Sequence, residues 1–179
     1  MGEIKSTLDL VLEKTKNLTL SSEEKEEQKQ KEIEKRIKGM IQKYQDGILS
    51  KNQLITDYEI LKKDTNMSQN ISLIIEITKR IEPDRDNQPL FEVLQECCTI
   101  DTAAIETLVG KFRKAYLTAS QNRMERLKED LARQYNISGS AVFPNLDADE
   151  QWRQETRRMR AGYEDQLNRM KDYLLGGMS

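Results

Sequence analysis

The protein has 179 residues, of which 34% are charged and 6% are aromatic, and its net charge is −2. The length fits one domain or one domain with a long arm. The excess of charged over aromatic residues is typical of long helices with narrow apolar seams rather than a compact β or α/β enzyme. A net charge near zero gives no general attraction to nucleic acid or to an anionic membrane. We therefore expect an all-α fold.

Residues 1–20 contain a short amphipathic segment, which we treat as a separate N-terminal region. Its apolar face would carry Leu8, Val11, Leu12 and Thr15. The same stretch contains Glu3-Ile4-Lys5-Ser6, then Leu8, then Glu13-Lys14-Thr15. This pattern resembles the start of small uncharacterised bacterial helical proteins. The resemblance covers only this start of the chain and implies no activity, cofactor or site residue.

Residues 21–100 read as a region of shorter helices. Apolar residues recur three or four apart, as they do on one face of a helix. The predicted helices are about 22–46, 50–63, 69–81 and 89–98. The expected caps are Ser21 with Glu24, then Ser50, then Ser68, with Pro89 in the first turn of the last helix. The first half of the first helix has no apolar side chain, so we interpret it as solvated and held by Glu–Lys pairs.

Residues 101–179 are predicted to form a long antiparallel helical hairpin or coiled coil, with the shorter helices packed near its open end. Asp101 is expected to cap its first helix, and Asp147 with Glu150 to cap its second. Two glycines, Gly176 and Gly177, would end the second helix.

A bend at about residue 141 would set the register of this hairpin. Trp152 would then meet Leu131, and Tyr163 would lie opposite the small residues Ala119 and Ser120. A large ring opposite small residues allows close packing. The alternative is that the two long helices pack on different partners, one of them in another subunit.

The chain has no histidine, which excludes a Ser-His-Asp triad and any zinc site that contains histidine. Its two cysteines, Cys97 and Cys98, are adjacent and cannot act as spaced zinc ligands. No glycine-rich phosphate-binding motif occurs. We therefore predict a protein that is not an enzyme and has no catalytic residues, no metal and no cofactor.

Two stretches are candidates for binding. The connection 136–146 offers a candidate interaction loop formed by Ser138, Gly139, Ser140, Val142 and Phe143. It either presents these residues to a partner, or Phe143 and Leu146 fold back to cover the core. On the second long helix, one flank carries Arg153, Arg157 and Arg160. These arginines either pair with nearby carboxylates or grip an anionic partner such as RNA phosphate.

The function that we favour is a non-enzymatic helical protein for protein–protein interaction or assembly, with self-association expected because narrow seams leave apolar flanks to cover. The alternative is an RNA- or ribosome-associated factor that uses the Arg flank. The sequence indicates no small-molecule substrate. No basic region followed by an apolar run opens the chain, and no apolar stretch is long enough to span a membrane. We expect a cytoplasmic location and no membrane partner.

Overall fold

The structure, a computed structural model, describes residues 21–176. The predicted amphipathic segment in residues 1–20, the resemblance that it carries, and Gly177 lie outside this range. The described residues form six α-helices and one 3-10 turn, without a strand, and this confirms the all-α class. The chain divides into two compact units, residues 1–67 and residues 68–179, and each is described by itself.

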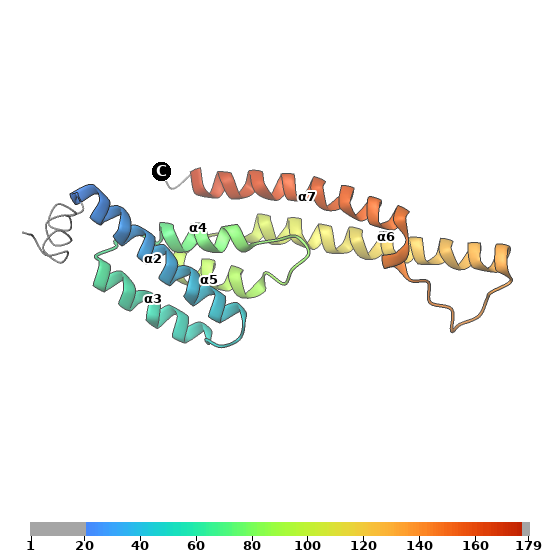
Figure 1. The fold of residues 1–179 in the computed structure, drawn as a ribbon, viewed down its shortest axis with the longest axis horizontal. Helices are drawn as coiled ribbons and strands as arrows, with labels where there is room; N and C mark the ends of the chain where they lie inside the picture. The colour runs from blue at the N-terminus through green and yellow to red at the C-terminus, as the bar shows by residue number, and fades with distance from the viewer. Residues whose placement is uncertain (1–20, 177–179) are drawn as a thin grey trace, which may run out of the picture. The chain divides into compact units, whose positions relative to one another are not determined.

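The first unit contains α2 (Ser22–Gln45) and α3 (Lys51–Thr65), which lie side by side (Figure 1). The predicted capping box at the start of α2 is present. Ser21 Oγ accepts from the Glu24 amide at 3.1 Å, and the Glu24 carboxylate accepts from the Ser21 amide at 2.7 Å. Ser50 caps α3 in the same way. The periodic apolar residues are buried, namely Ile33, Ile37, Ile41, Leu54, Tyr58 and Leu61.

The second unit contains four α-helices and a 3-10 turn. They are α4 (Ile71–Arg80), α5 (Gln88–Cys98), α6 (Ala103–Tyr135), η1 (Leu146–Ala148) and α7 (Glu150–Gly176). α4 contacts α5 and α7, and α6 contacts α7. The sequence groups α4 and α5 with the helices before them, whereas in the structure they belong to one compact unit with the long helices. Their apolar residues, including Leu73, Ile77, Leu90, Leu94, Leu108 and Phe112, are buried.

Three of the predicted caps are displaced. α6 begins at Ala103 after Thr102, and Asp101, one residue further back, accepts from the Ala103 amide at 2.9 Å. α4 begins at Ile71 after Asn70, so Ser68 does not cap it. Asn70 instead donates from Nδ2 to the Cys97 carbonyl at 2.7 Å, which ties the start of α4 to the end of α5. α7 begins after η1, and the Asp149 carboxylate accepts the backbone N–H of Gln151 at 2.9 Å. A free N–H in a first helical turn needs such an acceptor, and Asp149, rather than Asp147, provides it.

Aromatic contacts join α6 to α7, which lie side by side in Figure 1. The rings of Phe112 and Tyr163 meet edge-on with centroids 5.3 Å apart, and those of Tyr116 and Trp152 lie 5.4 Å apart. The predicted contact between Trp152 and Leu131 is therefore wrong, because Leu131 lies about 22 Å beyond Tyr116 along α6. We call these aromatic contacts the α6–α7 seam.

Candidate functional site

The connection between α6 and α7 does not form a symmetrical tip; it returns along α6. η1 contacts both α6 and α7. Asp149 forms an ion pair with Arg123, which lies about three turns before the end of α6. The last turns of α6 therefore extend past the start of α7. The predicted register assumed a bend at about residue 141, with both helices ending level at the bend. Because α6 extends past the start of α7, residues of α7 lie beside earlier residues of α6 than predicted.

The Arg123–Asp149 pair fixes the start of α7 on α6. Arg123 Nε donates to Asp149 Oδ2 at 2.6 Å, and both side chains are largely buried. The hydrogen bond from Arg123, aided by the Trp152 and Gln151 backbone amides, holds the pKa of the Asp149 carboxyl below its usual range. The carboxylate thus caps α7 and neutralises Arg123 at once.

This pair should make stability sensitive to acid. Because the pKa of Asp149 is lower in the folded than in the unfolded protein, its contribution exists above about pH 4 and is lost as the pH falls through the folded pKa. Asp149→Asn keeps a capping oxygen but removes the charge, and should lower the free energy of unfolding by about 1–2 kcal/mol at pH 7. The difference from wild type should shrink toward pH 3.

Urea unfolding followed by Trp152 fluorescence measures this difference, because Trp152 is the only tryptophan. Asp147→Asn changes an exposed carboxylate nearby and is the matched control. An Asp149→Asn effect of equal size at pH 3 and pH 7 would contradict the assignment.

The candidate interaction loop lies on the surface of this connection. Ser138, Gly139 and Ser140 are exposed, and Val142 is half-buried. The Val142 amide donates to the Gly139 carbonyl at 3.2 Å, closing a turn in which Gly139 has φ +126°. Only glycine adopts such a φ without strain, so the sequence Ser-Gly-Ser fits the turn that presents the loop.

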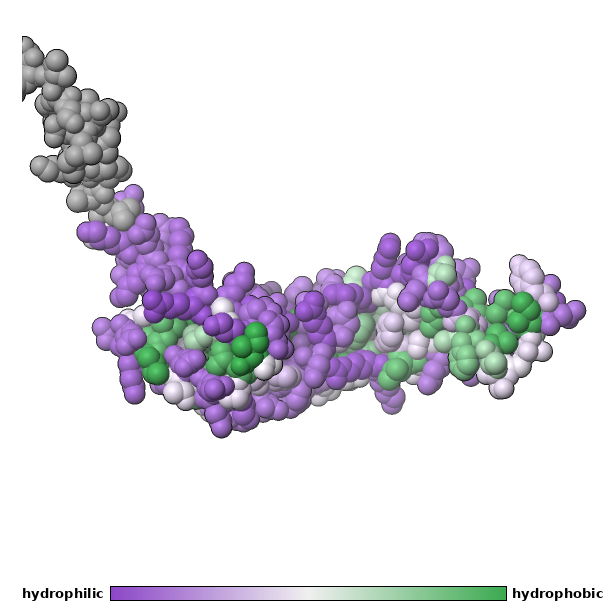
Figure 2. Space-filling view, turned by 60° about the horizontal axis from the view of Figure 1, so that its bottom comes forward, coloured by the Kyte–Doolittle hydropathy of each residue, from purple (hydrophilic) through white to green (hydrophobic). Residues whose placement is uncertain are grey.

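Phe143 is not covered by the core. Leu146 is half-buried, but the Phe143 side chain is 77% exposed. Its ring centroid lies 5.3 Å from the Lys128 ammonium, a cation–π contact on the overhanging part of α6. Two more large side chains at this end are exposed, Tyr135 at 66% and Ile137 at 48%. Figure 2 shows hydrophobic side chains gathered here. We call Tyr135, Ile137 and Phe143 the distal patch.

The three arginines of the predicted flank line one groove of about 650 Å³ between α6 and α7. We call it the arginine groove. Its other lining residues include Tyr116, Trp152 and Asp147. Arg153 pairs with Glu150 at 2.5 Å. The structure thus brings Arg153, Arg157 and Arg160 together as the sequence predicted, but not all of them keep a charge available for a ligand.

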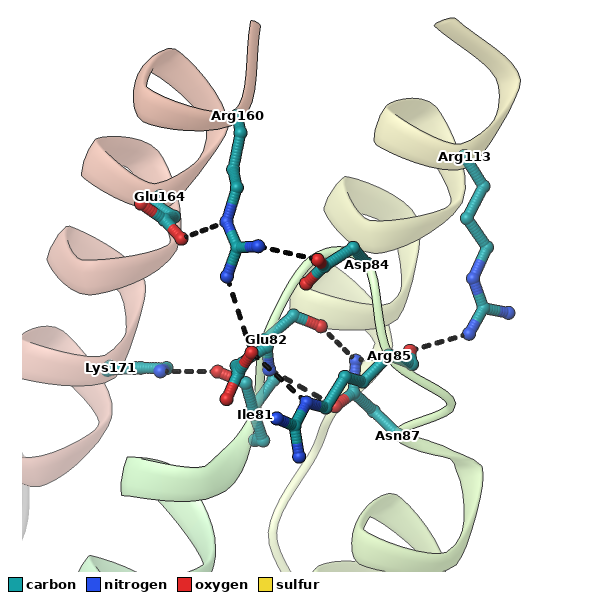
Figure 3. A network of polar contacts seen from close by, with 9 residues as sticks. All are labelled: Ile81, Glu82, Asp84, Arg85, Asn87, Arg113, Arg160, Glu164 and Lys171. Carbon is teal, nitrogen blue, oxygen red and sulfur yellow. Dashed lines mark hydrogen bonds and ion pairs between the residues drawn. The ribbon is translucent and has the colours of Figure 1, made fainter. Parts of the chain in front are cut away.

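Arg160 is the most heavily committed of the three. Its guanidinium donates to Glu164 and to Asp84 at 2.6 Å each, and to Glu82 at 3.3 Å (Figure 3). These bonds anchor the loop between α4 and α5 to α7. A guanidinium shared by three carboxylates is a structural clamp, because its donors already point at protein acceptors.

The same loop is held from other directions as well. Lys171 on α7 donates to the Ile81 carbonyl at 2.6 Å, and burial lowers the pKa of its ammonium. Arg113 on α6 donates to the Arg85 carbonyl at 2.7 Å. Inside the loop, the buried Asn87 amide donates to the Glu82 carbonyl at 2.6 Å (Figure 3). The network therefore serves to fix α4 and α5 against the long helices.

A second groove, which we did not predict, has a volume of about 490 Å³ and also lies along α6 and α7. We call it the basic groove. Its charged lining residues are Lys111, Lys114, Arg123, Arg126 and Glu155. It shares no lining residue with the arginine groove. The signal was present in the sequence, since Lys111, Lys114 and Arg126 repeat near helical spacing and so share one side of α6.

Within residues 21–176, no three Asp, Glu or Cys side chains come together as they would around a metal ion. Cys97 and Cys98 are half-buried thiols and form no disulfide. Within the same residues, no helix has both the length and the apolar character needed to cross a membrane.

Comparison with known proteins gave no match to a family model, to a curated protein or to a solved structure.

Proposed function

We propose that the protein is a non-enzymatic interaction or assembly protein. In this proposal α6 and α7 act as an antiparallel hairpin with a coiled-coil-like seam, and the distal patch contacts a protein partner. The observation that carries the proposal is the exposure of two aromatic rings and an isoleucine at one end of the unit. Large exposed apolar side chains that lie together are typical of interaction sites.

The composition of the distal patch favours a protein partner. Tyr135 and Phe143 are of the residue types that are enriched at protein interfaces, and aromatic anchors carry much of the binding energy there. Charged side chains lie on the same last turns of α6, where Arg133 pairs with both Glu129 and Asp130. An apolar centre within a polar rim is the usual organisation of an interface.

A second copy of the chain is one partner that this surface would accept. In the last turns of α6, the apolar residues Met124, Leu127 and Leu131 are only half-buried. Pairing two such ends would cover apolar surface on both chains. Sedimentation equilibrium on the purified protein measures this self-association directly.

An RNA- or ribosome-associated role is the second candidate. Within residues 21–176, Arg157 has no ion pair, and beside it in the arginine groove the Tyr116 ring is 39% exposed. A cation next to an exposed ring can hold a phosphate and a stacked base. Arg153 and Arg160, however, already pair with carboxylates, so we rank this role second. This role would be favoured if nucleic acid co-purified with the protein, dissociated on addition of salt, and no longer co-purified with the Arg157→Gln variant.

The test of the favoured role is the double variant Ile137→Ser with Phe143→Ser. Because both side chains are exposed, the free energy of unfolding should stay within about 0.5 kcal/mol of wild type. Capture of a protein partner, or of a second copy, should fall at least about tenfold, since an aromatic anchor contributes this much to binding. Quantitative mass spectrometry after affinity capture from the protein's own cells measures the loss.

The matched control is Tyr173→Ser, which removes another ring that is 86% exposed on α7. Capture should be unchanged by this control. Equal recovery of every partner by wild type and the double variant, together with an unchanged oligomeric state, would contradict the proposal.

A further inference from the structure

The basic groove carries a positive charge that its surroundings do not neutralise. Of its four cations, Arg123 is paired with Asp149. Lys111, Lys114 and Arg126 are exposed and form no ion pair within residues 21–176. The lining contributes a single carboxylate. The whole chain has a net charge of −2, so this excess of positive charge is local rather than a property of the composition.

The shape of the basic groove suits an elongated ligand. Two alanines, Ala115 and Ala119, line it on α6, and the half-buried Tyr163 lines it on α7. Small residues between two helices leave room for another chain to approach the backbone. The cations run from Lys111 to Arg126, a distance of about 22 Å along the helix axis.

We propose that the basic groove binds an acidic segment of a partner protein, a short stretch with several Asp or Glu side chains. Ammonium and guanidinium groups donate charge-assisted hydrogen bonds to carboxylates, and three cations along α6 match a ligand with repeated negative charge. The proposal extends the interaction role and rests on it only in taking the partner to be a protein.

Single-stranded nucleic acid fits the basic groove less well. Its bases need exposed aromatic faces on which to stack. The groove has one aromatic side chain, Tyr163, which is half-buried and meets Phe112 edge-on across the α6–α7 seam. The cations of the groove could bind phosphates, but its lining residues offer no exposed aromatic face on which the bases could stack.

The experiment measures binding of a fluorescein-labelled decaglutamate peptide to the full chain by fluorescence anisotropy at low salt. Decaglutamine and decauridylate RNA are the comparison probes. The test variant combines Lys111→Gln, Lys114→Gln and Arg126→Gln. The control variant removes three exposed lysines of α2 by Lys29→Gln, Lys35→Gln and Lys43→Gln, so that both variants lose the same charge. Circular dichroism confirms that each variant is folded.

We expect wild type and the control variant to bind decaglutamate and not decaglutamine. The test variant should bind it about tenfold or more weakly, and added salt should reduce the difference. Absence of binding, an equal loss in the control variant, or tighter binding of decauridylate through the same cations would each overturn the proposal. Phe143→Ser should leave decaglutamate binding unchanged, so failure of the distal patch and failure of the basic groove are told apart.

Discussion

Trp152→Ala should lower the free energy of unfolding by about 3 kcal/mol, one of the two largest effects that we expect in this chain. The Trp152 side chain is only 3% exposed and packs on Tyr116 across the α6–α7 seam. Removing a buried indole costs its transfer free energy and leaves a cavity. We place the cost at the lower end for such a change because Tyr116, at the surface, can move into the space.

Urea unfolding followed by circular dichroism measures this loss, since the variant has no tryptophan to report it. Tyr173→Ala, at an exposed ring on the same helix, should change the free energy of unfolding by less than about 0.5 kcal/mol. A double-mutant cycle distinguishes the observed register from the predicted one. Trp152 should couple to Tyr116, whereas its effect should simply add to that of Leu131→Ala. Coupling to Leu131, or a Trp152→Ala loss below about 1 kcal/mol, would contradict the packing that we describe.

The helices could be predicted from the sequence because their signals are local. A capping box such as Ser21 with Glu24 depends on residues three apart, and the buried stripe of Ile33, Ile37 and Ile41 depends on helical periodicity. Trp152 was correctly placed on the apolar side of its helix for the same reason. All of these signals lie within one or two turns of the chain.

The register of α6 and α7 could not be read in the same way. It depends on Arg123 meeting Asp149, a pair 26 positions apart, and nothing in the local sequence distinguishes Asp149 from Asp147 as the capping residue. Asp147 with Glu150 also satisfies the capping pattern. In the structure, the aspartate that pairs with Arg123 is also the one that caps the helix. This is Asp149, so α7 begins at Glu150.

The sequence predicted which arginines share a face of the helix, but not which of them form ion pairs with carboxylates elsewhere in the chain. The spacing of Arg153, Arg157 and Arg160 correctly indicated one shared flank. That Arg160 is held by Asp84 could not be foreseen, because the two residues are 76 positions apart. For the basic groove, the spacing of Lys111, Lys114 and Arg126 indicates one shared side of α6, but the sequence does not show that α7 completes a groove beside them.

Asn87→Ala is the second substitution with a large expected effect, about 3 kcal/mol lost from the free energy of unfolding. The Asn87 side chain is 1% exposed and sits inside the loop between α4 and α5. Its Nδ2 donates to the carbonyls of Glu82 at 2.6 Å and Arg85 at 3.2 Å, and its Oδ1 accepts from the Glu82 amide at 3.2 Å (Figure 3). Alanine would leave these backbone groups without a partner, and a buried polar group without a hydrogen bond is costly.

The loss should also spread beyond the loop. Arg160 and Lys171 both bond to the segment that Asn87 shapes, so loosening it weakens the attachment of α4 to α7. Urea unfolding followed by Trp152 fluorescence reports on this unit, and hydrogen exchange should show faster exchange in α4. Asn168→Ala removes an exposed amide from α7 and should cost less than about 0.5 kcal/mol. If Asn87→Ala were equally mild, the loop would not depend on that side chain, and the clamp of Arg160 would have to hold α4 and α5 in place by itself.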